Sequence, residues 1–325
     1  DAAAVPVEPI EVEARDVLVA GIGASIASGE GNPGWPVDLE DRGFCFERYG
    51  RSASRFQAPT RQRYRAARGA TACHGARDYD SKARDQRAMN RTRPAQWFDP
   101  ACHRSLYGNQ FRTALALALA NPQVAVVYLP LGCTGATISE GLLGKKDPRE
   151  HYRMPGGRYQ REVPAQLQQI ERLLDRKPRG RQRRSLDLVL LTVGANDAGF
   201  SELVANVLFD PQSSEISVVE KADMILEPAD AAAKVRDTLV PDFEALRDAL
   251  QPLVKDRDLS RVVFISYPNP GLFEDGRACR TGRRGFDIHP SNAPDKSRLR
   301  EVIAFVDAPA GDGGLLATLK SLAAC

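Results

Sequence analysis

The sequence predicts an α/β protein with one parallel β-sheet that is covered by helices on both faces. Four apolar runs of strand length alternate along the chain with segments of helical periodicity. The runs are nearly continuous in Val, Leu, Ile and Ala, as expected for strands that are buried on both faces of a parallel sheet. Because strands that alternate with helices form βαβ units, we expect the runs to build one sheet.

The expected elements follow one another in a regular order. The second strand follows a helix that ends at Asn121 and Pro122, and the longest helix is expected to break near Pro241, because proline lacks a backbone N–H. The expected strands are residues 15–22, 123–131, 186–193 and 261–267, and the expected helices are residues 109–120, 162–177, 229–255 and 296–307.

Length and charge limit the classes of protein to which this chain can belong. The 325 residues, 42% of them hydrophobic, are enough for one large core, and we expect a single domain over residues 1–325. The formal net charge of +3 is nearly balanced and indicates no nucleic-acid partner. The basic turn at residues 176–184 has no aromatic side chains to stack on bases and is predicted to be a solvated connector. No apolar run has the length of a membrane span.

Residues 38–105 interrupt the alternation of strands and helices. This segment is rich in Arg, with scattered Tyr and Phe, and is predicted to be a long surface excursion, such as a lid or a binding loop. We expect a disulfide between two of its three cysteines, Cys45, Cys73 and Cys102. The six cysteines of the chain show no zinc-ligand spacing, and the sequence starts with an Ala-rich stretch, so we expect a secreted or periplasmic protein.

The turns that follow the first three strands carry the residue types of a nucleophilic site. Ser25 follows the first strand among small residues, and a hydroxyl in this position is predicted to be a nucleophile. Gly135 and Asn196 lie in the turns after the second and third strands. Since the carboxyl ends of parallel strands meet at one edge, the N–H groups of Ser25 and Gly135 and the amide of Asn196 are expected to form an oxyanion hole.

A serine nucleophile of this kind needs a base, and the chain has four histidines, His74, His103, His151 and His289. His289 lies after the last predicted strand, with Asp287 nearby to orient it, and is predicted to be the base. The other three are interpreted as surface or capping residues. An alternative places the base on a segment beyond Cys325, where the chain ends after an apolar stretch.

Four motifs resemble the sequence blocks of the SGNH (GDSL-type) hydrolase superfamily. They are GASIASGEG at residues 23–31, CTGAT at 133–137, GAND at 194–197 and DIHP at 287–290. The resemblance implies a flavodoxin-like three-layer α/β/α sandwich and the hydrolysis of carboxylic esters of lipids or of O-acylated sugars. It also implies a catalytic set of Ser25, His289 and Asp287, and it implies neither a metal nor an organic cofactor.

Two positions depart from the pattern of this superfamily. Ala24 replaces an acidic residue that holds the turn around the serine, and Asp287 precedes His289 by two residues rather than three, with Phe286 at the expected place. A second hypothesis is therefore an SGNH-like protein of weakened activity that binds glycans or lipids. A remote alternative is a dinucleotide-binding domain, whose glycine fingerprint fails at Ile26.

Overall fold

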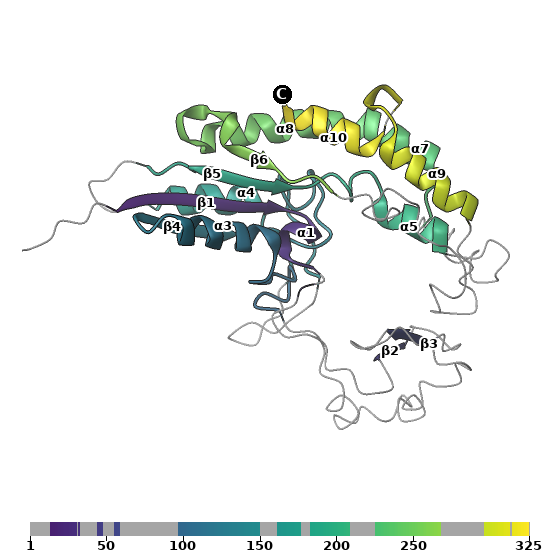
Figure 1. Cartoon of the computed structure of the whole chain (residues 1–325), viewed down its shortest axis with the longest axis horizontal. Coiled ribbons are helices and arrows are strands. Elements are labelled where there is room, and N and C mark those ends of the chain that lie inside the picture. Colours follow the sequence, from purple (N-terminus) through teal and green to yellow (C-terminus); the bar gives the residue numbers. More distant parts are fainter. Residues whose placement is uncertain are drawn as a thin grey trace, which may run out of the picture.

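The α/β class with a central parallel sheet is confirmed by the computed structural model of the chain. The structure describes residues 14–30, 32, 44–47, 55–58, 97–149, 161–176, 183–208, 225–267, 296–312 and 314–324. A four-stranded sheet in the order β4-β1-β5-β6 runs through its centre (Figure 1). The strands are β1 (Arg15–Gly23), β4 (Val124–Pro130), β5 (Leu188–Thr192) and β6 (Val262–Phe264).

Each neighbouring pair of these strands is parallel, so all four predicted strands are confirmed. In chain order the sheet reads 2-1-3-4, which is the order of the first four strands in flavodoxin-like folds. β1 pairs with β4 only as far as Gly21 and Pro130, whereas its pairing with β5 continues to Gly23 and Thr192. The end of β1 therefore has β5 on one side and no strand on the other.

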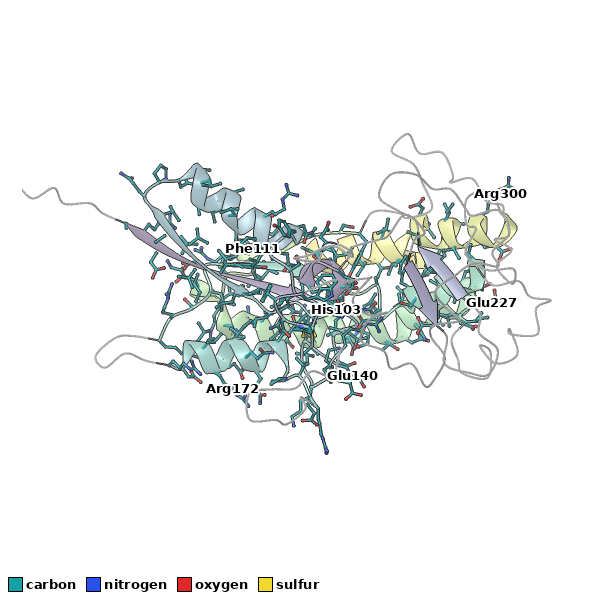
Figure 2. The ribbon with its side chains drawn as sticks, turned by 90° about the horizontal axis from the view of Figure 1, so that it is seen from below. His103, Phe111, Glu140, Arg172, Glu227 and Arg300 are labelled. Atoms are coloured by element: carbon teal, nitrogen blue, oxygen red, sulfur yellow. A yellow bond between two sulfur atoms is a disulfide. The ribbon has the colours of Figure 1, made fainter. Side chains whose placement is uncertain are left out.

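Helices cover both faces of the sheet and make three layers. On one face lies α3 (Asn109–Ala120), whose Phe111 meets Tyr128 of β4 edge to face at 5.7 Å. On the other face lie α4 (Gln166–Leu174) and α8 (Val240–Leu250), where Phe243 meets Phe264 of β6 at 6.0 Å. Figure 2 shows Phe111 of α3 and Arg172 of α4 on opposite sides of the strands.

The predicted helices lie where the sequence predicts them, but the longest of them differs in its internal structure. The helix expected at residues 229–255 consists of α7 (Pro228–Lys234), a π-helical stretch (Val235–Leu239) and α8, followed by 3₁₀ turns (Gln251–Leu253, Lys255–Arg257 and Leu259–Arg261). The predicted break near Pro241 is wrong, because the chain stays helical and the π-helical stretch precedes the proline. The other helices among the described residues are α1 (Ser25–Ser28), α5 (Phe200–Leu208), α9 (Lys296–Asp307), α10 (Leu315–Ala324) and a 3₁₀ turn (Ala310–Asp312).

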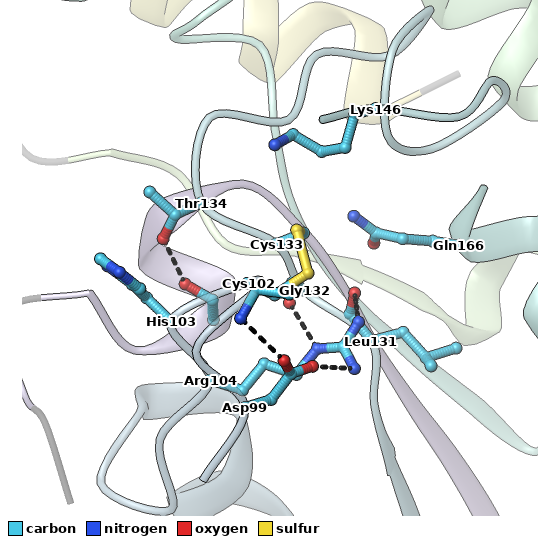
Figure 3. The surroundings of a disulfide bond; sticks show 12 residues. Asp99, Cys102, His103, Arg104, Leu131, Gly132, Cys133, Thr134, Lys146 and Gln166 are labelled. Carbon is cyan, nitrogen blue, oxygen red and sulfur yellow. Dashed lines mark hydrogen bonds and ion pairs between the residues drawn. A yellow bond between two sulfur atoms is a disulfide. The ribbon is translucent and has the colours of Figure 1, made fainter. Parts of the chain in front are cut away.

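The described parts of the 38–105 segment are a small hairpin and a buried stretch. The hairpin pairs β2 (Phe44–Glu47) with β3 (Arg55–Ala58) in antiparallel fashion. Residues 97–105 are not a surface excursion, since Ala101 and Cys102 are 1% and 0% exposed. Cys102 forms a disulfide with Cys133, across 31 residues of sequence (Figure 3). The expected disulfide therefore does not include Cys102, and the remaining pairing, Cys45 with Cys73, lies outside the described residues.

One cluster of buried apolar side chains joins the sheet to α4, α7, α8, α9 and α10. Residues 177–182 of the predicted basic connector lie outside the described part of the chain. None of the helices in the described part is long and apolar enough to cross a membrane.

Candidate active site

Ser25 lies at the carboxyl end of β1, where α1 begins (Figure 1). This helix has a single turn, in which the Ser28 hydroxyl donates a hydrogen bond to the Ser25 carbonyl oxygen at 2.8 Å. Gly29 ends the turn with φ +92°, a conformation that favours glycine. Ser25 is half-buried and Ala24 before it is 1% exposed, so the serine is the first residue of the turn that solvent reaches.

Hydrogen bonds join the turns after β1, β4 and β5 at this edge of the sheet. Cys133 N–H donates to the Gly23 carbonyl at 2.9 Å, which ties the second turn to the first. Ala24 N–H donates to the Thr192 carbonyl at 2.8 Å, which ties the first turn to the third. The Asn196 amide donates to the Ala136 carbonyl at 2.8 Å, which ties the third turn to the second. Three of the five predicted site residues therefore lie in connected turns.

Each of the three predicted oxyanion donors keeps a hydrogen for a ligand. The N–H groups of Ser25 and Gly135 have no hydrogen-bond acceptor among the described residues. Gly135 has φ +74° and is exposed, so its peptide can be approached closely. The Asn196 side-chain nitrogen carries two hydrogens, and one is used by Ala136. Each of the three groups therefore has a donor hydrogen without an acceptor among the described residues.

Gln166 of α4 fixes the last residue of β1 and was missed by the sequence analysis. Its side chain is 0% exposed and forms two hydrogen bonds with the Gly23 peptide groups. Gly23 N–H donates to Oε1 at 2.8 Å, and Nε2 donates to the Gly23 carbonyl at 2.9 Å. The turn that carries Ser25 is thus held by an amide from another helix, although Ala24 has no carboxylate.

The segment before α3 supports the second turn. The Arg104 guanidinium donates to the carbonyls of Gly132 at 3.0 Å and Leu131 at 3.2 Å, and it pairs with Asp99 at 2.9 Å (Figure 3). Together with the Cys102–Cys133 disulfide, these bonds fix the chain just before Gly135.

His103 and Glu30 are joined by a hydrogen bond beside the first turn. The His103 Nδ1 lies 2.8 Å from Glu30 Oε2, which also accepts the hydroxyl of Thr134 at 2.6 Å. The His103 side chain is 12% exposed and stacks on Trp97 with ring centroids 4.7 Å apart. The interpretation of His103 as a surface or capping residue is therefore wrong. Its φ of +50°, costly for a residue with a side chain, marks a position held by these contacts.

Asp197 is a buried carboxylate next to Asn196. Its Oδ1 accepts the Ile138 N–H at 2.8 Å, and its Oδ2 is buried without a hydrogen-bond partner among the described residues. Burial raises the pKa of Asp197 to about 6, against the opposing effect of the Ile138 hydrogen bond. The GAND motif predicts where Asp197 lies in the chain, but it does not predict that the carboxylate is buried.

The predicted base lies outside the part of the chain that the structure describes. His289 and Asp287 are not among the described residues, and neither are His74 and His151. Within the described ranges, no group of three or more His, Cys, Asp or Glu side chains could hold a metal ion.

The glycines at the end of β1 serve packing rather than phosphate binding. A β-carbon on Gly21 would meet the hydroxyl of Tyr128 and the amide oxygen of Gln110, and one on Gly23 would meet the Thr192 backbone. The absence of side chains at these two glycines therefore makes room for neighbouring groups of the protein. The four-residue α1 is also too short to present a helix N-terminus of the kind that such motifs use.

Comparison with known proteins gives one distant structural likeness. No protein family model matches the sequence, and no curated protein matches it. The structure is similar to that of an extracellular lipase from Streptomyces rimosus, with 17% sequence identity and a TM-score of 0.39. The match covers 96% of this chain and 76% of the lipase. A likeness at this TM-score carries no function over to this chain.

Proposed function

We propose that this chain is a serine hydrolase that cleaves carboxylic esters, with Ser25 as the nucleophile. The observation that carries the proposal is the set of hydrogen bonds that brings the turns of Ser25, Gly135 and Asn196 together at the carboxyl edge of the sheet. A serine hydroxyl, two backbone N–H groups and a side-chain amide in connected turns are the parts needed for attack on a carbonyl and for stabilising the resulting oxyanion. The substrate would be an ester of a lipid or an O-acylated sugar, and the protein would be secreted or periplasmic.

In the proposed reaction, the Ser25 hydroxyl adds to the ester carbonyl and its proton passes to the base. The carbonyl oxygen becomes negatively charged and is bound by the N–H groups of Ser25 and Gly135 and by the Asn196 amide. Loss of the alcohol leaves an acyl group on Ser25, which water then removes. His289, oriented by Asp287, is the base of this proposal.

Hydrolysis of 4-nitrophenyl acetate tests this assignment. Ser25→Ala is expected to abolish turnover, and Asn196→Ala to lower kcat about 100-fold or more, because one oxyanion donor is lost. Asn121→Ala, at the exposed end of α3, serves as the control and is expected to keep full activity. Turnover that persists in Ser25→Ala would refute the nucleophile, and unchanged kcat in Asn196→Ala would refute the oxyanion role.

The base is tested separately. His289→Asn is expected to reduce kcat to the level of Ser25→Ala while the circular dichroism spectrum stays that of the unmodified protein. Full activity in His289→Asn would assign the base to another residue and contradict this part of the proposal.

Ala24 favours a second candidate function, a weakened hydrolase that binds glycans or lipids. The buried Ala24 side chain offers no group to hold the turn, in contrast to the acidic residue of the superfamily. Under this alternative the unmodified chain shows no turnover, and Ala24→Asp gains it. The hydrogen bonds between Gln166 and Gly23 support the first candidate, because they hold the turn without a carboxylate.

A further inference from the structure

Lys146 brings a positive charge next to Gly135. A β-carbon added to Gly135 would lie 3.9 Å from the Lys146 Nζ, with no nearer atom around it. Lys146 is thus a cationic neighbour of one of the proposed oxyanion donors. Figure 3 shows its side chain extending above the disulfide from the Gln166 side of the view toward Thr134.

The position of Lys146 is fixed by its backbone and by its stem. Its N–H donates to the Val163 carbonyl at 3.1 Å, and its carbonyl accepts the Val163 N–H at 2.8 Å, so the residue forms an antiparallel bridge. Its Cδ would lie 3.2 Å from a β-carbon on Gly141, which shows that the stem packs over this glycine. A stem held in this way keeps the ammonium group near Gly135.

This ammonium group has no ion-pair partner among the described residues. Its Nζ donates to the Asp147 backbone carbonyl at 2.6 Å, a neutral acceptor. The Glu140 and Asp147 carboxylates favour its charged form from a distance, and Arg149 opposes it. Burial, the largest influence, lowers the pKa of Lys146. The neighbouring Lys145 differs in its surroundings, because it is 64% exposed and pairs with Glu162 at 2.9 Å.

We propose that Lys146 binds an anionic group of the substrate, a carboxylate a few bonds from the ester carbonyl. A partly desolvated ammonium without a counter-ion gains most from an anion that replaces its missing hydration. A carboxylate bound there places the ester carbonyl beside the Gly135 N–H, so charge recognition and the oxyanion hole act on the same substrate. This inference rests on the proposed ester hydrolysis and narrows its substrate to esters of dicarboxylic acids or of hydroxy acids.

Matched pairs of esters test the inference. One pair carries the charge on the acyl side, mono-4-nitrophenyl glutarate and its methyl ester; the other carries it on the alcohol side, 4-acetoxybenzoate and its methyl ester. The measured quantity is the ratio of kcat/KM for the anionic ester to kcat/KM for its neutral partner. Lys146→Met is expected to lower this ratio about 10- to 100-fold for at least one pair, as loss of a hydrogen bond to a charged group does. Lys146→Arg is expected to keep most of it, and Lys145→Met to leave it within about 2-fold of the unmodified enzyme.

If Lys146→Met leaves the ratio of kcat/KM values unchanged for both pairs, the inference is overturned. This includes the result in which Lys146→Met lowers kcat/KM equally for the anionic and the neutral ester of a pair. A binding measurement separates this failure from failure of the proposed function. In Ser25→Ala, titration calorimetry with glutarate and with 4-acetoxybenzoate is expected to show binding that Lys146→Met in the same background abolishes. Absence of turnover in the unmodified protein would refute ester hydrolysis, whereas absence of any Lys146-dependent binding would refute the anion site.

Discussion

Replacing Gln166 by Leu tests whether α4 holds the nucleophile turn. Gln166 Oε1 is the acceptor of the buried Gly23 N–H, and its Nε2 donates to the Gly23 carbonyl. Leu has nearly the same volume but no polar atom, so Gln166→Leu removes both hydrogen bonds and keeps the packing. The Gly23 carbonyl retains the Cys133 N–H, but the Gly23 N–H loses its partner.

The cost follows from these two bonds. A buried N–H without a partner costs about 1–3 kcal/mol, and the second hydrogen bond contributes about 1 kcal/mol net. We therefore expect Gln166→Leu to lower the free energy of unfolding by about 2–4 kcal/mol. Ser25 follows Gly23 by two residues, and a shift of about 1 Å at a reacting group can cost about 100-fold in rate. We expect kcat to fall at least about 10-fold, with a smaller change in KM.

Urea denaturation followed by circular dichroism gives the stability, and 4-nitrophenyl acetate hydrolysis gives the rate. Gln168→Leu is the control, because it makes the same exchange at an exposed position of the same helix. If Gln166→Leu unfolds at the same urea concentration as Gln168→Leu, the hydrogen bonds to Gly23 do not stabilise the turn. If it is less stable but equally active, Gln166 supports the fold without positioning Ser25.

Two further predictions concern stability. Replacing both Cys102 and Cys133 by Ala removes a disulfide between residues that are 31 positions apart, and is expected to lower the free energy of unfolding by about 4 kcal/mol. Urea denaturation measures this, and an unchanged midpoint would contradict it. Burial raises the pKa of Asp197 from 3.8 to about 6, so between these pH values the folded protein holds a proton that the unfolded chain releases, and stability falls as pH rises. Relative to Asp197→Asn, the free energy of unfolding of the unmodified protein is expected to fall by up to about 3 kcal/mol over this range. Thermal unfolding of both proteins at several pH values measures the difference, and a difference that does not change with pH would refute the prediction.

The strands and the turns after them could be predicted because their signals are local. Each strand is a short apolar run, and in a parallel sheet the carboxyl ends share one edge whatever the strand order. The placement of Ser25 and Asn196 in connected turns follows from these two facts alone. The helix at residues 109–120 was equally clear, since proline follows its last turn.

The partners of the site could not be predicted, because they come from segments far apart in the sequence. Gln166 is one of many polar residues in its helix, and only the packing of α4 brings it to Gly23, 143 residues away. The disulfide partner of Cys102 depends on how residues 97–105 fold back on the second turn. The role of His103 depends on Glu30, 73 residues away. No spacing within the chain signals these contacts.

The pairing of Gly23 with Gln166 has a consequence for the end of β1. At Gly23 the backbone N–H and C=O point to the side of β1 from which β4 has already departed, since β4 ends opposite Gly21. The primary amide of Gln166 presents a donor and an acceptor in one plane, as a peptide does, and so stands in for one missing residue of the neighbouring strand. The sheet is completed at this point by a side chain, while the Cys133 N–H of the following turn shares the Gly23 carbonyl. The last residue of the strand that presents the nucleophile therefore depends on the placement of a helix as well as on the turn after β4.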